Sequence, residues 1–250
     1  MKLSAEEKQE RRLLFSRMTP AEKADYIFTY YKLPIFLAVI AIIILISTIV
    51  RVVTHKNMVL YTAGINVVMG EEMEEALSAG FITAYGYNPA KQDVYLYENL
   101  YLSDNPLEEY HSYSYASEMK ILGATESKKL DLVLMNHESY DLLSSKGYLL
   151  DLSLLAKDYP LLSAVPADAF VSNDVLISDN SLEVTLNEEI PLEQDIVSCV
   201  NGLCLNDSPV LKSAALDGDV YLGVVANSPR IDAAVEYMCY LMGNERGTGR

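Results

Sequence analysis

Cysteine and basic side chains are scarce in this sequence. Its 250 residues include three cysteines, far fewer than a small fold held together by disulfide bonds requires, so a hydrophobic core must stabilise the chain. Lysine and arginine together number 19, against 35 aspartates and glutamates, and the net charge is −16. Because nucleic-acid binding depends on basic side chains that neutralise phosphates, this charge disfavours a nucleic-acid partner.

Motifs of catalysis and cofactor binding are also absent. The sequence has no glycine-rich phosphate loop, no nucleophile elbow and no paired-cysteine metal site. The segment HESYD, residues 137–141, lacks the second histidine of the zinc-protease pattern, and Asp217-Gly218-Asp219 is too short for a calcium loop. We therefore expect a protein that is not an enzyme and that holds neither a metal nor a cofactor.

One long apolar stretch interrupts this acidic chain. Residues 33–50 carry no charge, and residues 33–53 form a helix long enough to cross the ~30 Å of a bilayer's hydrocarbon. A buried core helix, the alternative, normally has a polar face. The stretch is longer than the apolar part of a signal peptide and no small-x-small cleavage site follows it, so it should remain as a signal-anchor. Lipidation is excluded because the first cysteine is Cys199.

The distribution of basic residues predicts the orientation of this span. Arg51 and Lys56 closely follow it, whereas seven basic residues precede it: Lys2, Lys8, Arg11, Arg12, Arg17, Lys23 and Lys32. Positive charge stays on the cytoplasmic side, so the N-terminus should be cytoplasmic and residues 54–250 extracellular at the cell membrane. Residues 51–250 hold 12 basic and 30 acidic side chains. Solvated surface is the favoured interpretation of this acidity, and attraction of cations or of a basic partner is the alternative.

The leader, residues 1–32, should form two short amphipathic helices. Two capping boxes indicate their starts, Ser4 with Glu7 and Thr19 with Glu22, the second followed by Pro20. Pro34 disfavours helical geometry at the preceding residue, so the second helix should break or kink as it enters the membrane. The aromatic residues expected at the headgroup level are Tyr26, Phe28, Tyr30 and Tyr31.

Strand and helix patterns alternate beyond the span. The expected strands are residues 59–69, 93–102, 130–135 and 220–225. The expected helices are residues 71–84, 105–122, 136–146 and 228–242, the third capped by Asn136 and stopped by Gly147. This order predicts a three-layer α/β fold with a largely parallel sheet covered by helices. Tyrosines alternate along residues 93–102, where they either cover one face of the sheet, the favoured interpretation, or stack on a ligand.

Residues 164–217 have a less regular pattern. Short strands are candidates at residues 182–186 and 199–205. An Asn201-Gly202 turn would place Cys199 opposite Cys204 within reach of a disulfide. Free, buried cysteines are the equally weighted alternative.

Two segments resemble a known family. Residues 130–160, LDLVLMNHESYDLLSSKGYLLDLSLLAKDYP, resemble the third strand, the following helix and the Leu-Asp-Leu segment of type 2 extracellular (periplasmic) solute-binding proteins. Residues 220–245 are similar to the returning strand and helix of that family. The resemblance implies one lobe of such a protein, with residues 164–217 as a reduced second lobe. Residues 18–35, MTPAEKADYIFTYYKLPI, resemble leaders of single-span membrane proteins of Gram-positive, clostridia-like bacteria.

This sequence departs from the family pattern in two respects. Only about 54 residues, 164–217, remain for a second lobe, and the segment before the third strand differs. The glycine and proline usual before the aspartate of the third strand are replaced by Ser127, Lys128, Lys129 and Leu130. Tryptophan, which often stacks on sugars in such proteins, is absent, whereas tyrosine occurs 18 times.

A ligand of such a fold binds at the carboxyl ends of the strands. The residues predicted to line that rim are Met69, Gly70, Asn136, His137 and Glu138. The ligand would be a small solute, peptide or glycan. The alternative is a cell-envelope interaction or assembly protein that has no small ligand and binds a membrane partner protein.

Overall fold

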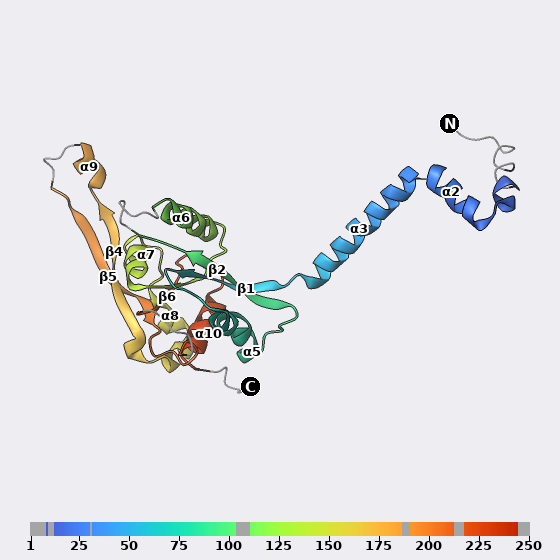
Figure 1. Ribbon diagram of the computed structural model, residues 1–250. Helices are drawn as coiled ribbons and strands as arrows, with labels where there is room; N and C mark the ends of the chain where they lie inside the picture. Colours follow the sequence, from blue (N-terminus) through green and yellow to red (C-terminus); the bar gives the residue numbers. More distant parts are fainter. Residues whose placement is uncertain are drawn as a thin grey trace. The chain divides into compact units, whose positions relative to one another are not determined.

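The computed structural model describes residues 9, 13–30, 32–103, 111–186, 191–212 and 218–244. The chain divides into two compact units, Met1–His55 and Lys56–Arg250 (Figure 1). The predicted capping box at Ser4, the aromatic residue Tyr31 and the predicted helix start at residues 105–110 lie outside the described residues.

The first unit contains helix α2 (Pro20–Tyr30) and helix α3 (Lys32–Thr54). The predicted capping box starts α2: Glu22 Oε2 accepts from the Thr19 backbone N–H at 2.8 Å, and the Glu22 N–H donates back to Thr19 Oγ1 at 3.5 Å. The backbone N–H of Thr19 lowers the pKa of Glu22. Leu33 and Pro34 both lie in α3, so helical geometry includes the residue before the proline, where the sequence predicted a break or kink. Pro34 lies in the first turn of α3, where a missing N–H costs nothing.

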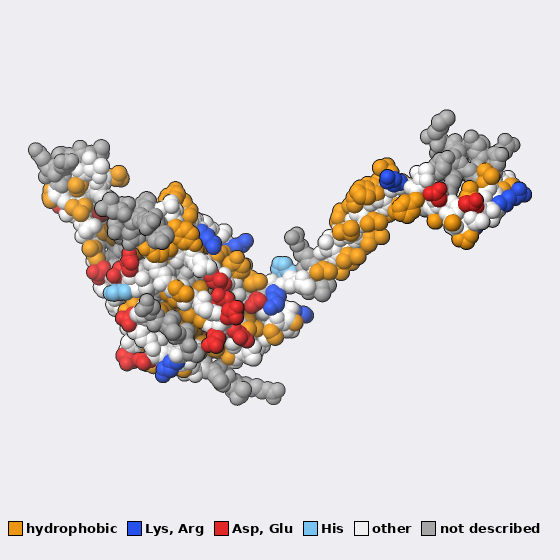
Figure 2. All heavy atoms as spheres, in the orientation of Figure 1, with side chains coloured by type: hydrophobic (Ala, Val, Ile, Leu, Met, Phe, Trp, Pro, Cys, Tyr) orange, Lys and Arg blue, Asp and Glu red, His pale blue; other side chains and the backbone are white. Residues whose placement is uncertain are grey.

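Helix α3 is long and apolar enough to cross a membrane. Its segment Lys32–Val50 has a mean hydropathy of 3.0 and buries none of its length against protein, and Figure 2 shows apolar side chains along it. Two of its hydroxyls donate within the helix: Thr48 Oγ1 donates to Ile44 O at 2.8 Å and Thr54 Oγ1 to Val50 O at 2.7 Å. Internal pairing of this kind is what a lipid environment requires.

The second unit is built on a six-stranded sheet in the order β2-β1-β3-β6-β5-β4. The strands are β1 (Asn57–Ile65), β2 (Gln92–Leu100), β3 (Leu132–Met135), β4 (Phe170–Asp179), β5 (Gln194–Cys204) and β6 (Tyr221–Val224). Strand β1 runs parallel to β2 and β3, whereas β3, β6, β5 and β4 pair antiparallel in that order. The predicted largely parallel sheet is therefore mixed. Helical crossovers connect the parallel strands β1, β2 and β3, whereas the strands that follow β3 along the chain pair antiparallel with their neighbours.

Helices cover both faces of the sheet. One face packs against α4 (Glu71–Glu75), the π-helix η1 (Ala76–Gly80), α5 (Phe81–Ala84), α8 (Leu152–Asp158) and α10 (Ile231–Leu241). The other face packs against α6 (His111–Glu126) and α7 (His137–Ser145). In β3, Leu132 and Leu134 belong to the first cluster, and Val133 and Met135 to the second. Successive side chains of a strand point to opposite faces of the sheet, so the four buried side chains of β3 alternate between the two core clusters.

The tyrosines of β2 pack on one another and on the protein. Tyr95 and Tyr97 have ring centroids 4.7 Å apart, and Lys120 of α6 lies 5.5 Å above the Tyr97 ring. Tyr97 also packs against the second core cluster. These contacts agree with the interpretation that the tyrosines cover the sheet.

Residues 164–217 are more regular than their sequence indicates. The 3₁₀ turn η2 (Pro160–Ala164) ends at the first of these residues. They then contain the 3₁₀ turn η3 (Ala167–Ala169), the two longest strands of the sheet and helix α9 (Ser181–Leu186). The predicted strand at residues 182–186 is wrong. The alternation of Leu182, Val184 and Leu186 resembles a strand, but Asp179 Oδ1 accepts from the Ser181 N–H and hydroxyl and starts a helix.

The predicted Asn201-Gly202 turn is also wrong, because both residues lie inside β5. A Cβ on Gly202 would come within 2.7 Å of the Tyr140 ring. The absence of a side chain at Gly202 therefore allows β5 to pack closely against Tyr140, which belongs to the helix at residues 137–145. Cys199 and Cys204 are therefore five positions apart on one strand, about 16 Å, whereas a disulfide needs Cα atoms within roughly 7 Å. Both cysteines are free, as is Cys239.

The three thiols should differ in reactivity. Burial raises the pKa of the Cys239 thiol to about 11, and its Sγ lies 3.5 Å from Leu161 O. We expect iodoacetamide at pH 8 to modify the half-buried Cys199 and Cys204 in the native protein and Cys239 only after unfolding, because the thiolate is the nucleophile. Intact mass spectrometry with and without reductant tests for a disulfide, and peptide mapping after labelling identifies the thiols that iodoacetamide has modified. A mass that changes on reduction, or Cys239 labelled first, would contradict the structure.

Candidate functional site

The residues predicted to line the rim follow two neighbouring parallel strands. Strand β1 ends at Ile65 and β3 at Met135, and these two residues are paired in register. Met69 and Gly70 lead from β1 into α4, while Asn136 begins α7 directly after β3. The structure therefore places both segments at the same edge of the sheet.

Asn136 caps α7 as the sequence predicts. Its Oδ1 accepts from the Ser139 N–H at 3.0 Å, and Gly147, with φ of +70°, follows the helix end. We expect Asn136→Ala to lower the free energy of unfolding by about 1 kcal/mol, because an N-terminal N–H loses its acceptor. Urea denaturation measures this loss. Asn136→Asp, which keeps an acceptor, should stay close to the unchanged protein, and an equal loss in both variants would argue against the cap.

His137 and Glu138 are exposed at the start of α7. The His137 side chain is 70% exposed, and its Nδ1 lies 3.6 Å from Asp141 Oδ1. Its ring centroid lies 5.6 Å from that of Tyr221, which in turn stacks on Tyr140 at 4.9 Å with an interplanar angle of 13°. These three rings, His137, Tyr221 and Tyr140, form an aromatic row at the rim.

Tyr221 and Tyr140 were not among the predicted rim residues. Tyr221 begins β6 and pairs with Met135, so it lies at the carboxyl end of β3 only because β6 runs antiparallel to that strand. Its position could not be predicted without the strand order. Burial raises the pKa of both tyrosines. Tyr140 is 2% exposed and supports the half-buried Tyr221 from beneath, so the amphipathic face available to a ligand belongs to Tyr221, beside the exposed His137.

Met69 and Gly70 contribute less to this surface. Met69 is half-buried, packs against the first core cluster and covers Gly64 of β1. Gly70 precedes α4 without a side-chain cap, and the first turn of α4 is acidic, with Glu71, Glu72 and Glu74. The polar and aromatic groups of the rim therefore come from α7 and β6.

A buried hydrogen-bond network fixes the aromatic row. The Tyr140 hydroxyl donates to Asn201 Oδ1 at 2.7 Å, and Asn201 Nδ2 donates to Ser144 Oγ at 2.6 Å. Asn201 and Ser144 are fully buried. The network joins α7 to β5, so the Tyr140 ring is held rigidly beneath Tyr221.

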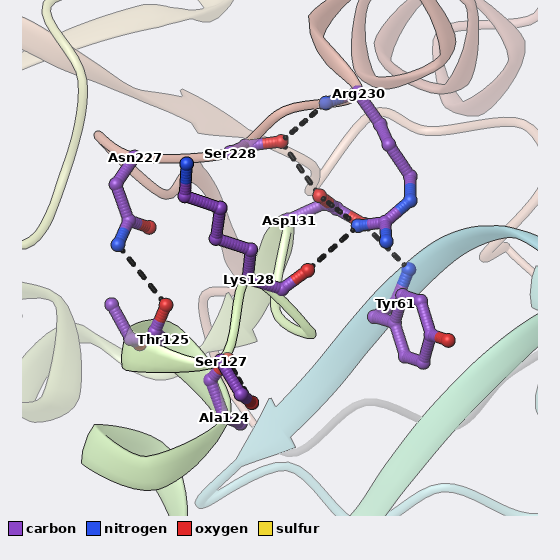
Figure 3. A network of polar contacts seen from close by, with 9 residues as sticks. All are labelled: Tyr61, Ala124, Thr125, Ser127, Lys128, Asp131, Asn227, Ser228 and Arg230. Carbon is purple, nitrogen blue, oxygen red and sulfur yellow. Dashed lines mark hydrogen bonds and ion pairs between the residues drawn. The ribbon is translucent and has the colours of Figure 1, made fainter.

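A second polar network lies at the opposite edge of the sheet, at the amino end of β3 (Figure 3). Asp131 is fully buried. Its Oδ1 accepts from Ser228 Oγ at 2.6 Å and from Arg230 Nη1 at 3.0 Å, and its Oδ2 accepts from the Tyr61 N–H at 2.8 Å. Arg230 also donates to Lys128 O at 3.0 Å and lies 4.6 Å above the Tyr61 ring. Both carboxylate oxygens are occupied, which indicates a structural role.

Two hollows lie away from the rim. One, of about 580 Å³, is lined mainly by the small residues of η1 and α5, by acidic residues of α4 and by Tyr240. The other, of about 370 Å³, lies between the ends of β4 and β5 and is lined by Ser178, Asp179, Asn180, Glu193, Gln194 and Asp195. Within the described part of the chain, no group of three or more His, Cys, Asp or Glu side chains could hold a metal ion.

Comparison with known proteins adds no family to this geometry. The chain matches no protein-family model, no curated protein and no solved structure.

Proposed function

We propose that the chain is a single-pass membrane protein with a cytoplasmic N-terminus and an extracellular C-terminal unit. The apolar, unburied surface of α3 supports the anchor. The excess of basic residues before α3 over those just after it supports the orientation.

We further propose that the C-terminal unit is related in fold to one lobe of type 2 solute-binding proteins. Three features support this relation: the parallel strands β2, β1 and β3, the capped helix α7 after β3, and the returning strand β6 beside β3, followed by α10. Asp151 of the Leu-Asp-Leu segment caps α8 by accepting from the Ser153 N–H at 2.9 Å.

Its function in this proposal is binding of a small solute, peptide or glycan at the rim, without catalysis. The observation that carries this is the aromatic row His137–Tyr221–Tyr140 beside the cap residue Asn136 at the carboxyl end of β3. Rings with polar tips at the edge of a rigid sheet suit sugars and peptide planes.

A second candidate is an envelope interaction or assembly protein without a small ligand. The connection between β4 and β5 favours it, because only residues 180–193 separate these strands. A connection of this length cannot form a second lobe that closes over the rim.

Thermal unfolding of the full chain in nanodiscs separates the candidates. A sugar, peptide or amino acid that binds only the folded state raises the melting temperature, and the rise grows with the logarithm of its concentration once that concentration exceeds Kd. The rise should disappear in Tyr221→Ala and persist in Tyr115→Ala, which removes a tyrosine of α6 that is 60% exposed. No rise with any ligand, together with recovery of a membrane partner, would replace the first candidate by the second.

A further inference from the structure

Strands β4 and β5 form an arm that extends past the rest of the sheet (Figure 1). They pair with each other from Phe170↔Leu203 to Asp179↔Gln194. Strand β5 pairs with β6 only at Leu203 and Cys204. We use "the arm" for residues 175–186 and 191–198, where neither strand has a second neighbour among the described strands.

The arm exposes large apolar side chains. The exposed fractions are 60% for Ile177, 80% for Leu182, 55% for Leu192, 50% for Ile196 and 49% for Val197. Ile196 and Val197 are adjacent, so they point to opposite faces of the ribbon. A two-stranded ribbon buries too little surface to be stable alone, and clustered apolar exposure of this kind marks interaction surfaces.

The base of the arm is fixed to the protein, which gives it a defined orientation. Ser144 Oγ of α7 donates to Asp174 O at 3.2 Å, and Asn173 Nδ2 donates to Asp141 Oδ1 at 2.7 Å. A Cβ placed on Gly147, which follows α7, would lie 3.8 Å from Val175 Cγ1. These contacts end where the arm begins.

The charge of the arm identifies the chemistry of its partner. Residues 158–211 contain no lysine or arginine. Exposed acidic side chains accompany the apolar ones at Asp179, Glu183, Glu193 and Asp195, and Figure 2 shows apolar and acidic side chains on this part of the molecule. Like charges disfavour an anionic lipid surface and a second copy of the chain, whereas a basic surface is complementary.

We propose that the arm is a docking site for a partner protein segment that carries apolar and basic side chains. That segment wraps around the ribbon, so that its apolar side chains cover Ile196 on one face and Val197 on the other, together with Ile177, and its basic side chains pair with the acidic residues at the tip. This interaction goes beyond the proposed rim ligand and does not depend on it.

The probe that tests the proposal is a fluorescent decapeptide of alternating leucine and lysine, with a leucine–glutamate decapeptide as its counterpart. Binding to the full chain in phosphatidylcholine nanodiscs is measured by anisotropy at low and high salt. We expect the lysine peptide to bind at least tenfold more tightly than the glutamate peptide and to weaken as salt increases.

Two sets of variants locate the binding. The double variant Ile177→Ser and Ile196→Ser, and the triple variant Asp179→Asn, Glu193→Gln and Asp195→Asn, should each weaken binding at least tenfold. The controls make equivalent changes elsewhere: Val68→Ser, at a valine that is 93% exposed, and Glu71→Gln, Glu72→Gln and Glu75→Gln in α4. They should leave binding unchanged.

Three results would overturn the proposal. One is equal binding of the two peptides, and another is an equal loss in the α4 control, which would indicate nonspecific attraction to acidic surface. The third is a dimer in sedimentation analysis that Ile177→Ser dissociates, which would show that a second copy covers the arm.

Discussion

Replacing Arg230 with leucine is expected to lower the free energy of unfolding by about 3 kcal/mol, because it leaves the Asp131 carboxylate buried without its counter-ion. Asp131 is fully buried, whereas the Arg230 side chain is 28% exposed. The remaining donors, the Ser228 hydroxyl and the Tyr61 N–H, cannot replace a positive charge. This partial exposure of Arg230 places the expected loss at the lower end for buried ion pairs. Urea denaturation of the full chain in nanodiscs, followed by tyrosine fluorescence, measures the loss.

Lys146→Leu is the matched control for this variant. Lys146 pairs with Glu118 at 2.8 Å, but the two side chains are 42% and 41% exposed. Water screens such a pair, so the expected change is at most about 1 kcal/mol. If Arg230→Leu costs no more than Lys146→Leu, the network around Asp131 does not join β1, β3 and the start of α10 in the way described.

Gly202→Ala should be destabilising by about 2 kcal/mol, because the new methyl group overpacks a closed site. Its Cβ would lie 2.7 Å from both Cζ and Oη of Tyr140. The Tyr140 ring cannot move aside freely, since it stacks on Tyr221 and donates to Asn201. The substitution should therefore also disturb the aromatic row of the rim. Chemical denaturation gives the first effect, and near-ultraviolet circular dichroism reports the second.

Gly123→Ala makes the same chemical change in the exposed part of α6, where a Cβ meets nothing within 4 Å. Alanine is the better helix former, so this variant should gain about 0.5–1 kcal/mol. Opposite signs for the two glycines would support the packing described. A gain in both would mean that Gly202 lies in an open strand and not against the Tyr140 ring.

Hydrophobic periodicity was sufficient for the first half of the second unit. Strands β1, β2 and β3 and helix α7 appear close to their predicted bounds, because each buries a regular stripe and α7 has local start and stop residues. The prediction of a largely parallel sheet was wrong because the direction of β6 depends on where the chain returns after β5. That is a long-range property.

The errors in residues 164–217 have the same origin. Asn201-Gly202 is a strong local turn signal, but Tyr140, 62 residues before Gly202, fills the space beside it, and Ser144 pairs with Asn201. Partners so distant in sequence leave no local pattern. The rim was predicted as two segments at one edge because β1 and β3 are parallel neighbours, whereas Tyr221 depends on the antiparallel direction of β6.

Protease accessibility in intact cells tests the membrane topology most directly. The full chain carries one epitope tag at each end, and cells are treated with protease before fractionation. We expect loss of the C-terminal tag and a membrane-bound fragment that keeps the N-terminal tag and α3. Recovery of the whole chain in the soluble fraction, or an acidic unit that is cut only after the cells are permeabilised, would contradict this topology.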